Sequence, residues 1–190
     1  MNMQKLQEKY KKEVIPAMMK HFGYKNPMAV PKITKVTVNT SFGKQAVTKT
    51  SGEREKMQNL IMQDLSLIAG QRPKLVASKK SIAGFKLREG LEIAMMVTLR
   101  KGRMWDFLER LIYISLPKSR DFKGLDQKGV DKGGSLNVGF KEHIHFPEIF
   151  TEKEKTIFGL QVTVSTNAKD REKGMELFKL LGFPIKETKS

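Results

Sequence analysis

The densest group of side chains that could do chemistry lies between Gln71 and Gly90. This segment holds six cations against a single acid, Glu89, with serine and glycine between them. Cations on a flexible backbone bind phosphate, because each neutralised phosphate releases condensed counterions without any reading of base sequence. The pattern predicts contact with nucleic acid, and a solvated charged loop is the alternative. Its polar members are Arg72, Lys74, Ser78, Lys79, Lys80, Ser81, Lys86 and Arg88.

One aromatic residue, Phe85, lies in the same segment. An aromatic ring can stack on a nucleobase. Anchoring a loop to the core is the commoner use of one aromatic residue. Both interpretations of Phe85 stay open at the level of sequence.

A second segment, from Pro117 to Gly134, has a more balanced charge. It carries five cations and three aspartates, together with five glycines and prolines. Mixed charge suits a protein partner better than bare phosphate, and the glycine content favours a mobile excursion that a partner could order.

His143 and His145 are two residues apart, a spacing that can hold a metal ion. The sequence has no cysteine and no second cluster of ligands beside them. We therefore expect no metal, and we expect these imidazoles to pack or to meet RNA. Gly43-Lys44 lacks the spaced glycine of a phosphate-binding loop, and no Gly-x-Ser-x-Gly or dinucleotide motif occurs. We expect no catalytic residues, no cofactor and no enzyme activity.

Charge and composition narrow the class of protein. The chain has 190 residues, with 36 Lys and Arg against 20 Asp and Glu, a formal net charge of +16. Such an excess favours a polyanionic partner. Nucleic acid fits best, since an acidic membrane surface needs a basic amphipathic helix or a lipid anchor and neither is evident. Without cysteine, a signal sequence or a long apolar run, we expect a cytoplasmic protein with no membrane partner.

Apolar periodicity predicts the elements that must position these residues. A helix over 2–21 should kink or break at Pro16. A second helix should begin with a capping box at Thr50 and end at Gly70. A third helix, from Met104, should stop before Pro117. A last helix should cover 170–181. Strands are predicted at 33–39, 91–100, 136–140 and 158–165.

This order lacks the regular strand and helix alternation of a doubly wound sheet. It favours an α+β fold: a single-layer, mostly antiparallel sheet with helices packed on one face, a polar opposite face and long basic loops. Hydroxyl and amide groups on an open sheet face can bind phosphate, ribose and base edges of RNA. An ordinary solvated sheet face is the alternative.

Four motifs, in this order and spacing, resemble those of the bacterial ribosomal protein L-five family. They are Ser81 to Gly90, Val97 to Phe107, Arg120 to Leu125 and Phe146 to Ile149. The resemblance extends from the first helix to about Pro184. It implies a single ribosomal-protein domain over 1–184, with loops protruding at about 71–90 and 117–134.

The resemblance also implies a function and partners. It implies a ribosome-bound structural protein of the large subunit that is a monomer within the ribosome. In the central protuberance it attaches 5S rRNA, beside 23S rRNA and ribosomal protein L-eighteen. The 5S rRNA contacts correspond to Lys35, Thr37, Asn39, Thr98 and Arg100.

Two further contact regions follow from the resemblance. A loop that reaches the peptidyl-site tRNA corresponds to Arg72, Lys74, Ser78, Lys79, Lys80, Ser81 and Phe85. An intersubunit bridge to the small-subunit head protein S-thirteen corresponds to Arg120, Asp121, Phe122, Lys123, Asn137, Lys141 and Glu142.

The sequence departs from the family pattern in two places. After Asn39 the bulkier Thr40 to Gly43 replaces a glycine-rich turn, and a lysine-bearing stretch runs on to Lys56. The tail 185–190 lies beyond the usual end, and we expect it to be disordered. An RNA-modifying enzyme and a basic regulator that binds duplex RNA are the rival hypotheses.

Overall fold

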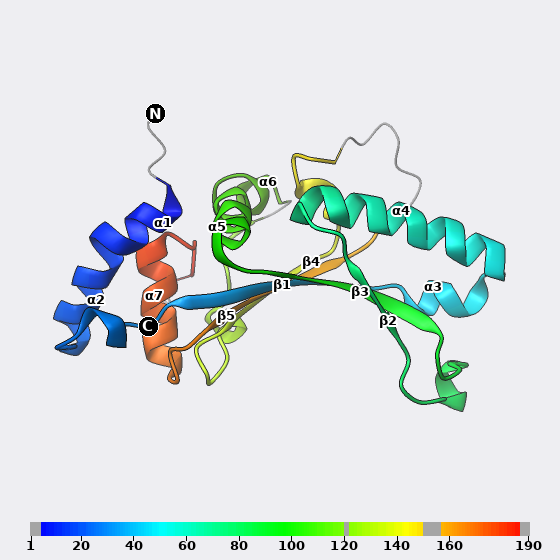
Figure 1. Ribbon diagram of the computed structural model, residues 1–190, viewed down its shortest axis with the longest axis horizontal. Helices are drawn as coiled ribbons and strands as arrows, with labels where there is room; N and C mark the ends of the chain where they lie inside the picture. The colour runs from blue at the N-terminus through cyan, green and yellow to red at the C-terminus, as the bar shows by residue number, and fades with distance from the viewer. Residues whose placement is uncertain (1–4, 120–121, 150–156, 187–190) are drawn as a thin grey trace. The chain divides into compact units, whose positions relative to one another are not determined.

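The chain folds into helices and strands in irregular alternation (Figure 1). The structure, a computed structural model, describes residues 5–119, 122–149 and 157–186. Within these ranges, no helix combines the length and the apolar composition needed to cross a membrane. The strands are β1 (Ile33–Ser41), β2 (Lys74–Ala77), β3 (Glu92–Leu99), β4 (Leu136–Phe140) and β5 (Leu160–Thr166). The α-helices are α1 (Leu6–Lys9), α2 (Ile15–Phe22), α3 (Gly43–Thr48), α4 (Ser51–Ala69), α5 (Lys101–Arg110), α6 (Leu116–Lys118) and α7 (Arg171–Leu181).

The five strands pair in the order β2-β3-β1-β5-β4. Strand β2 is antiparallel to β3. The hydroxyl of Thr34 donates to the carbonyl of Ser165 at 3.1 Å, and the hydroxyl of Thr40 donates to that of Gly159 at 2.8 Å. Advancing along β1 therefore means retreating along β5, which makes this pair antiparallel as well. The predicted α+β class with one antiparallel sheet is confirmed.

Alternate residues of the long strands are buried. On β1, Val36 and Val38 have no exposed surface, whereas Lys35, Thr37 and Asn39 are partly exposed. Successive side chains of a strand point to opposite faces. Each long strand therefore has a buried apolar face and a more exposed face. The exposed face of β1 and β5 is mainly polar, as predicted, whereas that of β3 also carries Ala94 and Met96. The buried residues on the other long strands are Met95, Val97, Leu99, Leu136, Val138, Phe140, Leu160, Val162 and Val164.

Two compact units make up the chain. Unit 1 comprises Met1–Val36, Leu99–Val138 and Thr163–Ser190, and unit 2 comprises Thr37–Thr98 and Gly139–Val162. The single domain expected over residues 1–184 stays a prediction.

Aromatic and backbone contacts join the helices of unit 1. The rings of Tyr10 and Trp105 have centroids 5.7 Å apart, which brings the first helix against α5. The Tyr10 hydroxyl donates to the carbonyl of Pro31 at 3.0 Å, next to the start of β1, and burial raises the pKa of Tyr10. The ammonium of Lys9 reaches the carbonyl of Leu181 at the end of α7.

A long helix supplies the core of unit 2. Figure 1 shows α4 running along one side of the strands of this unit. The predicted capping box starts it: Thr50 and Glu53 exchange hydrogen bonds at its N-terminus, and Gly70 ends it in the left-handed conformation. Its buried residues follow one stripe, Met57, Ile61, Leu65, Ile68 and Ala69.

Pro16 and Pro117 both lie within continuous helices, which contradicts the break predicted at Pro16 and the helix end predicted before Pro117, while the kink at Pro16 stays a prediction. The π-helical turn Tyr10–Val14 runs directly into α2, which contains Pro16, and the π-helical turn Leu111–Ser115 runs into α6, which contains Pro117. Proline removes one intrahelical donor, and a wider π turn accommodates the lost bond. The first helix therefore does not break at Pro16, and the second does not stop before Pro117. Residues 2–4 of the predicted first helix lie outside the described residues.

The segment after α6 is more ordered than expected. Leu125 and Val130 are buried, and Leu125 forms a parallel bridge with Ile185. Lys186 donates its backbone N–H to the carbonyl of Leu125 at 2.9 Å. Apolar anchoring thus replaces the predicted mobile excursion over its described part, 122–134. The same bonds show that Ile185 and Lys186 are ordered, so the tail predicted to be disordered does not begin at residue 185. Residues 187–190 lie outside the described residues.

Candidate RNA interface

A β-hairpin carries the basic segment that the sequence singles out. We call β2, the connecting residues 78–91 and β3 the hairpin arm. Ser78 N–H donates to the carbonyl of Leu91 at 2.8 Å, and Gly90 N–H donates to that of Ser78 at 3.0 Å, so the pairing continues past the ends of both strands. Gly90 has φ +80°, a conformation that favours glycine.

The tip of the hairpin arm is a compact second turn. Ile82 and Leu87 exchange backbone hydrogen bonds of 3.0 and 3.1 Å around four residues. The hydroxyl of Ser81 donates to the carbonyl of Leu87, and that of Ser78 to the carbonyl of Lys80. These bonds give the tip a defined shape, in place of the flexible loop expected from its glycine and serine content.

All six cations of the hairpin arm and its approach are exposed. None of them takes part in an ion pair with another residue that the structure describes. The hairpin arm has two acids against them, Glu89 and Glu92. The arm therefore presents its charge to a partner and does not neutralise it internally. The cations are Arg72, Lys74, Lys79, Lys80, Lys86 and Arg88.

Phe85 lies at this tip and is 71% exposed, with Ile82 beside it at 45%. The interpretation of Phe85 as an anchor to the core is therefore wrong. An exposed ring on a charged arm is free to stack on a base or a ribose. The tRNA-contacting residues named from the sequence all belong to this arm or to its approach.

Three side chains form a polar stripe along β1: Lys35, Thr37 and Asn39. All three are partly exposed. On the neighbouring strand β3, Thr98 is also partly exposed, and Arg100 follows as the exposed residue just before α5. Lys35 and Arg100 belong to unit 1, and Thr37, Asn39 and Thr98 belong to unit 2.

The stripe differs from the polar residues around it in its hydrogen bonding. The side chains of Thr37, Asn39 and Thr98 have no hydrogen-bond partner among the residues with described positions. In contrast, the hydroxyls of Thr40 and Thr163 donate to protein oxygens at 2.8 and 2.7 Å. The donors and acceptors of the stripe are therefore available to an outside ligand.

The residues named for the intersubunit bridge are only partly described. Lys123 and Lys141 are exposed, and Phe122 and Glu142 are partly exposed. Asn137 is exposed on β4, and its side chain accepts a hydrogen bond from Thr163 at 2.7 Å. Arg120 and Asp121 lie outside the described residues.

The two histidines differ in their surroundings. His143 is fully buried, stacks on Phe158 with ring centroids 3.9 Å apart, and lies with Nε2 3.8 Å from a carboxylate oxygen of Asp64. His145 is partly exposed and bonds the carbonyl of Glu142 at 2.9 Å. No group of three or more potential metal ligands lies together in the described part of the chain. Packing, one of the two roles expected for these imidazoles, is confirmed for His143.

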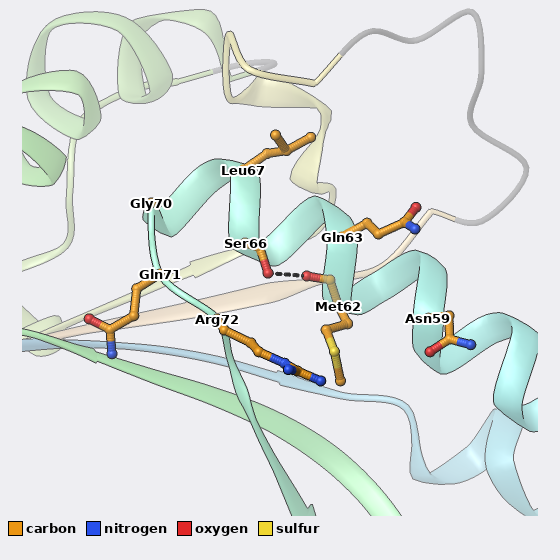
Figure 2. A pocket seen from close by; sticks show the side chains of 8 residues that line it. All are labelled: Asn59, Met62, Gln63, Ser66, Leu67, Gly70, Gln71 and Arg72. Carbon is orange, nitrogen blue, oxygen red and sulfur yellow. Dashed lines mark hydrogen bonds between the residues drawn. The ribbon is translucent and has the colours of Figure 1, made fainter.

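A groove that sequence reasoning missed runs along the outer side of α4 (Figure 2). In this view Arg72 extends beneath the helix toward Met62, whereas Gln71 points away from it. Arg72 is the one ionisable residue of its lining, so the groove offers hydrogen bonds and apolar contact but no acid and base pair. The lining residues are Asn59, Met62, Gln63, Ser66, Leu67, Gly70, Gln71 and Arg72. The missed signal was the uncharged outer face of α4 from Asn59 to Leu67, apart from Asp64.

Comparison with known proteins identifies the family. A family model described as ribosomal protein L5 matches residues 26–88, and a model of the C-terminus of the same family matches residues 92–185. Three proteins named large ribosomal subunit protein uL5 are similar along almost their whole length. That of Desulforapulum autotrophicum is 48% identical and covers 95% of this chain and 98% of its own. Those of Geotalea daltonii and Colwellia psychrerythraea are both 45% identical and both cover 97% of this chain and 99% of their own.

These matches confirm the resemblance that the four sequence motifs carry. The chain therefore belongs to the ribosomal protein L5 family, and it is a structural constituent of the large ribosomal subunit, not an enzyme.

Proposed function

We propose that this protein binds 5S rRNA and attaches it to the large subunit in the central protuberance. The polar stripe of β1, with Thr98 and Arg100, provides the contact surface. The observation that carries this proposal is the set of hydroxyl and amide groups on Thr37, Asn39 and Thr98, which are partly exposed and unpaired among the described residues. Such groups match the ribose hydroxyls and base edges of an RNA minor groove.

The hairpin arm provides a second contact, to the peptidyl-site tRNA. Its exposed cations attract phosphate at long range, and Phe85 at the tip offers an aromatic surface for stacking. Charge without specific hydrogen bonding suits a partner that arrives and leaves in each cycle. The division of labour is therefore a polar stripe for stable RNA and a charged arm for transient RNA.

Two groups of protein and RNA neighbours complete the proposal. The small-subunit head protein S-thirteen contacts the residues assigned to the intersubunit bridge. These are Arg120, Asp121, Phe122, Lys123, Asn137, Lys141 and Glu142. Their mixture of cations, carboxylates, one amide and one ring is typical of a polar protein interface. 23S rRNA and ribosomal protein L-eighteen are the neighbours within the large subunit.

The test is the affinity of the purified full chain for 5S rRNA. Thr37→Val with Asn39→Ala removes a hydroxyl and an amide that have no hydrogen-bond partner among the described residues. At about 1 kcal/mol for each lost hydrogen bond, we expect roughly 25-fold weaker binding. The matched control is Thr34→Val on the same strand, because that hydroxyl donates to the carbonyl of Ser165. Equal affinity of the double variant and the control would refute the proposed contact.

A further inference from the structure

An apolar patch interrupts the polar face of the sheet in unit 2. Met96 on β3 is 37% exposed, although the residues on either side of it are buried. Strand pairing places Lys74 directly opposite Met96 and Val76 directly opposite Ala94, and residues paired in this way lie on the same face of a sheet. Val76 and Ala94 are partly exposed. We call Val76, Ala94 and Met96 the Met96 patch.

The Met96 patch adjoins the residues proposed to bind RNA. The N–H of Phe42 donates to the carbonyl of Ile93 at 2.9 Å, and the strands of this sheet are antiparallel. Asn39 is three residues back along β1 and Met96 is three residues forward along β3, so Asn39 lies beside Met96. Thr98 follows two residues later on the same face of β3. An amide and a hydroxyl without hydrogen-bond partners among the described residues therefore border the patch.

The patch itself has little net charge around it. Among the described strand residues of unit 2, this face carries one cation, Lys74, and one acid, Glu92. Lys74 is opposite Met96, and Glu92 stands two residues before Ala94 on β3. Their charges offset each other, so packing and hydrogen bonding must select the ligand of the patch.

The size and the chemistry of the patch suit a nucleobase. A stable protein interface covers about 800 Å² of each partner, far more than one half-exposed methionine and two smaller side chains offer. The thioether of methionine is polarizable and packs favourably against an aromatic ring. RNA-binding sheets of other folds hold unpaired bases flat against side chains of the open face, with the base edges read by neighbouring polar groups.

We propose that the Met96 patch holds one unpaired base of 5S rRNA. The base stacks on the side chain of Met96, and the amide of Asn39 hydrogen-bonds its edge. An amide carries a donor and an acceptor side by side, which match the amino group and the ring nitrogen of adenine. A paired base is stacked within its own helix, so the patch selects a loop or a bulge. This inference rests on the proposed binding of 5S rRNA and names the nucleotide that the surface recognises.

Substitution of Met96 tests the stacking contact in the full chain. Met96→Ala removes the stacking surface without removing a charge, so 5S rRNA should bind about fivefold more weakly. The factor should be the same at 50 and 200 mM salt, because no phosphate contact is lost. Met96→Leu keeps most of the apolar surface and should stay within about twofold of the unmodified chain. The matched control is Leu60→Ala on α4, where Leu60 is 45% exposed, and it should leave the affinity unchanged.

A crosslink identifies the nucleotide. The chain has no cysteine, so Met96→Cys introduces a single thiol that can carry a photo-crosslinking azide. In large subunits that contain the labelled chain, we expect this probe to link to one unpaired adenine of 5S rRNA. The same probe on Leu60→Cys should not link to that nucleotide.

An abasic substitution at the linked nucleotide completes the test. It should weaken binding of the unmodified chain about fivefold and should weaken binding of the Met96→Ala chain little further, because both changes remove the same contact.

Several results overturn the inference. A crosslink to a paired nucleotide or to a ribosomal protein contradicts the proposed ligand, as does the absence of any product. Unchanged affinity of Met96→Ala, or a loss that disappears at higher salt, contradicts stacking. If Thr37→Val with Asn39→Ala weakens binding and Met96→Ala does not, the proposed function stands and this inference fails. If the unmodified chain does not bind 5S rRNA, both fail.

Discussion

Removing the two adjacent lysines of the hairpin arm is the sharpest test of how the arm works. Lys79 and Lys80 are both exposed, and the hydrogen bond that shapes their turn runs from the Ser78 hydroxyl to the backbone carbonyl of Lys80. Alanine at both positions keeps that bond and the fold of the arm. The change therefore removes two charges and little else.

The size of the effect follows from counterion release. Each phosphate contact contributes about 0.9 to the slope of log affinity against log salt, so two lost contacts lower the slope by about 1.8. Counterion release makes no contribution at 1 M salt. Relative to the unmodified chain, the double variant should therefore bind tRNA about 60-fold more weakly at 0.1 M salt and about 20-fold more weakly at 0.2 M. The loss must shrink as salt rises.

The assay is the affinity of tRNA for the peptidyl site of ribosomes reconstituted with the variant chain. Lys128→Ala with Lys132→Ala is the control, because both lysines are exposed and lie outside the arm. We expect the control to leave tRNA affinity unchanged. Affinity of the free Lys79 and Lys80 variant for 5S rRNA should stay within about twofold of the unmodified chain, since exposed charges at a distance are screened. A loss of 5S rRNA binding with tRNA affinity intact would show that the roles of arm and stripe are reversed.

Two predictions concern the scaffold. A Cβ added at Gly174 in α7 would lie 2.5 Å from the Cα of Gly134, so Gly174→Ala should lower the free energy of unfolding by about 1–3 kcal/mol in a denaturant titration. Gly102→Ala in α5 meets open space and should be neutral or stabilising; equal effects of the two changes would contradict the close contact. Thr50→Ala removes the cap of α4 and should cost about 1 kcal/mol at neutral pH. Hydrogen bonds from Thr50 lower the pKa of Glu53. The capping box therefore stabilises the fold at neutral pH, and this stability is lost as pH falls through the lowered pKa. If the Tm difference between the unmodified chain and Thr50→Ala does not narrow in acid, the capping box is contradicted.

Local signals in the sequence predicted most of the scaffold. The capping box at Thr50 and Glu53 specified the start of α4 because both bonds lie within one turn. The alternation around Val36 and Val38 predicted the polar stripe, since a strand with one buried face must turn its other side chains outward. The stripe ends at Ile33, which lies on the same face of β1 as Lys35 but is buried. No local sequence pattern indicated that Ile33 would be buried.

The structural features that the sequence did not predict depend on contacts between residues that local sequence patterns do not relate. Strand β2 is only four residues long and lies within a basic run, and its pairing with β3 is visible only once the two segments meet. The helices pass through Pro16 and Pro117 because π turns absorb the missing donor, which a rule for isolated helices misses. In the sequence, Leu125 belongs to a polar segment. Its pairing with Ile185 was not predicted, because Ile185 is distant from it in the sequence.

The groove along α4 was not predicted for a different reason. Leu67 is an apolar residue of a helix, and only the folded structure shows that it is exposed. An exposed apolar residue and a buried one look alike until the position of the partner surface is known.

The affinity of the full chain for 5S rRNA, measured between 50 and 200 mM salt beside an unrelated hairpin RNA, tests the central claim most directly. If cations supply attraction through about six phosphates while the polar stripe supplies selectivity, affinity for 5S rRNA should fall on the order of a thousandfold over this range. At each salt concentration, 5S rRNA should still bind more tightly than the hairpin. A complex that is insensitive to salt, or equal affinity for both RNAs, would contradict this account.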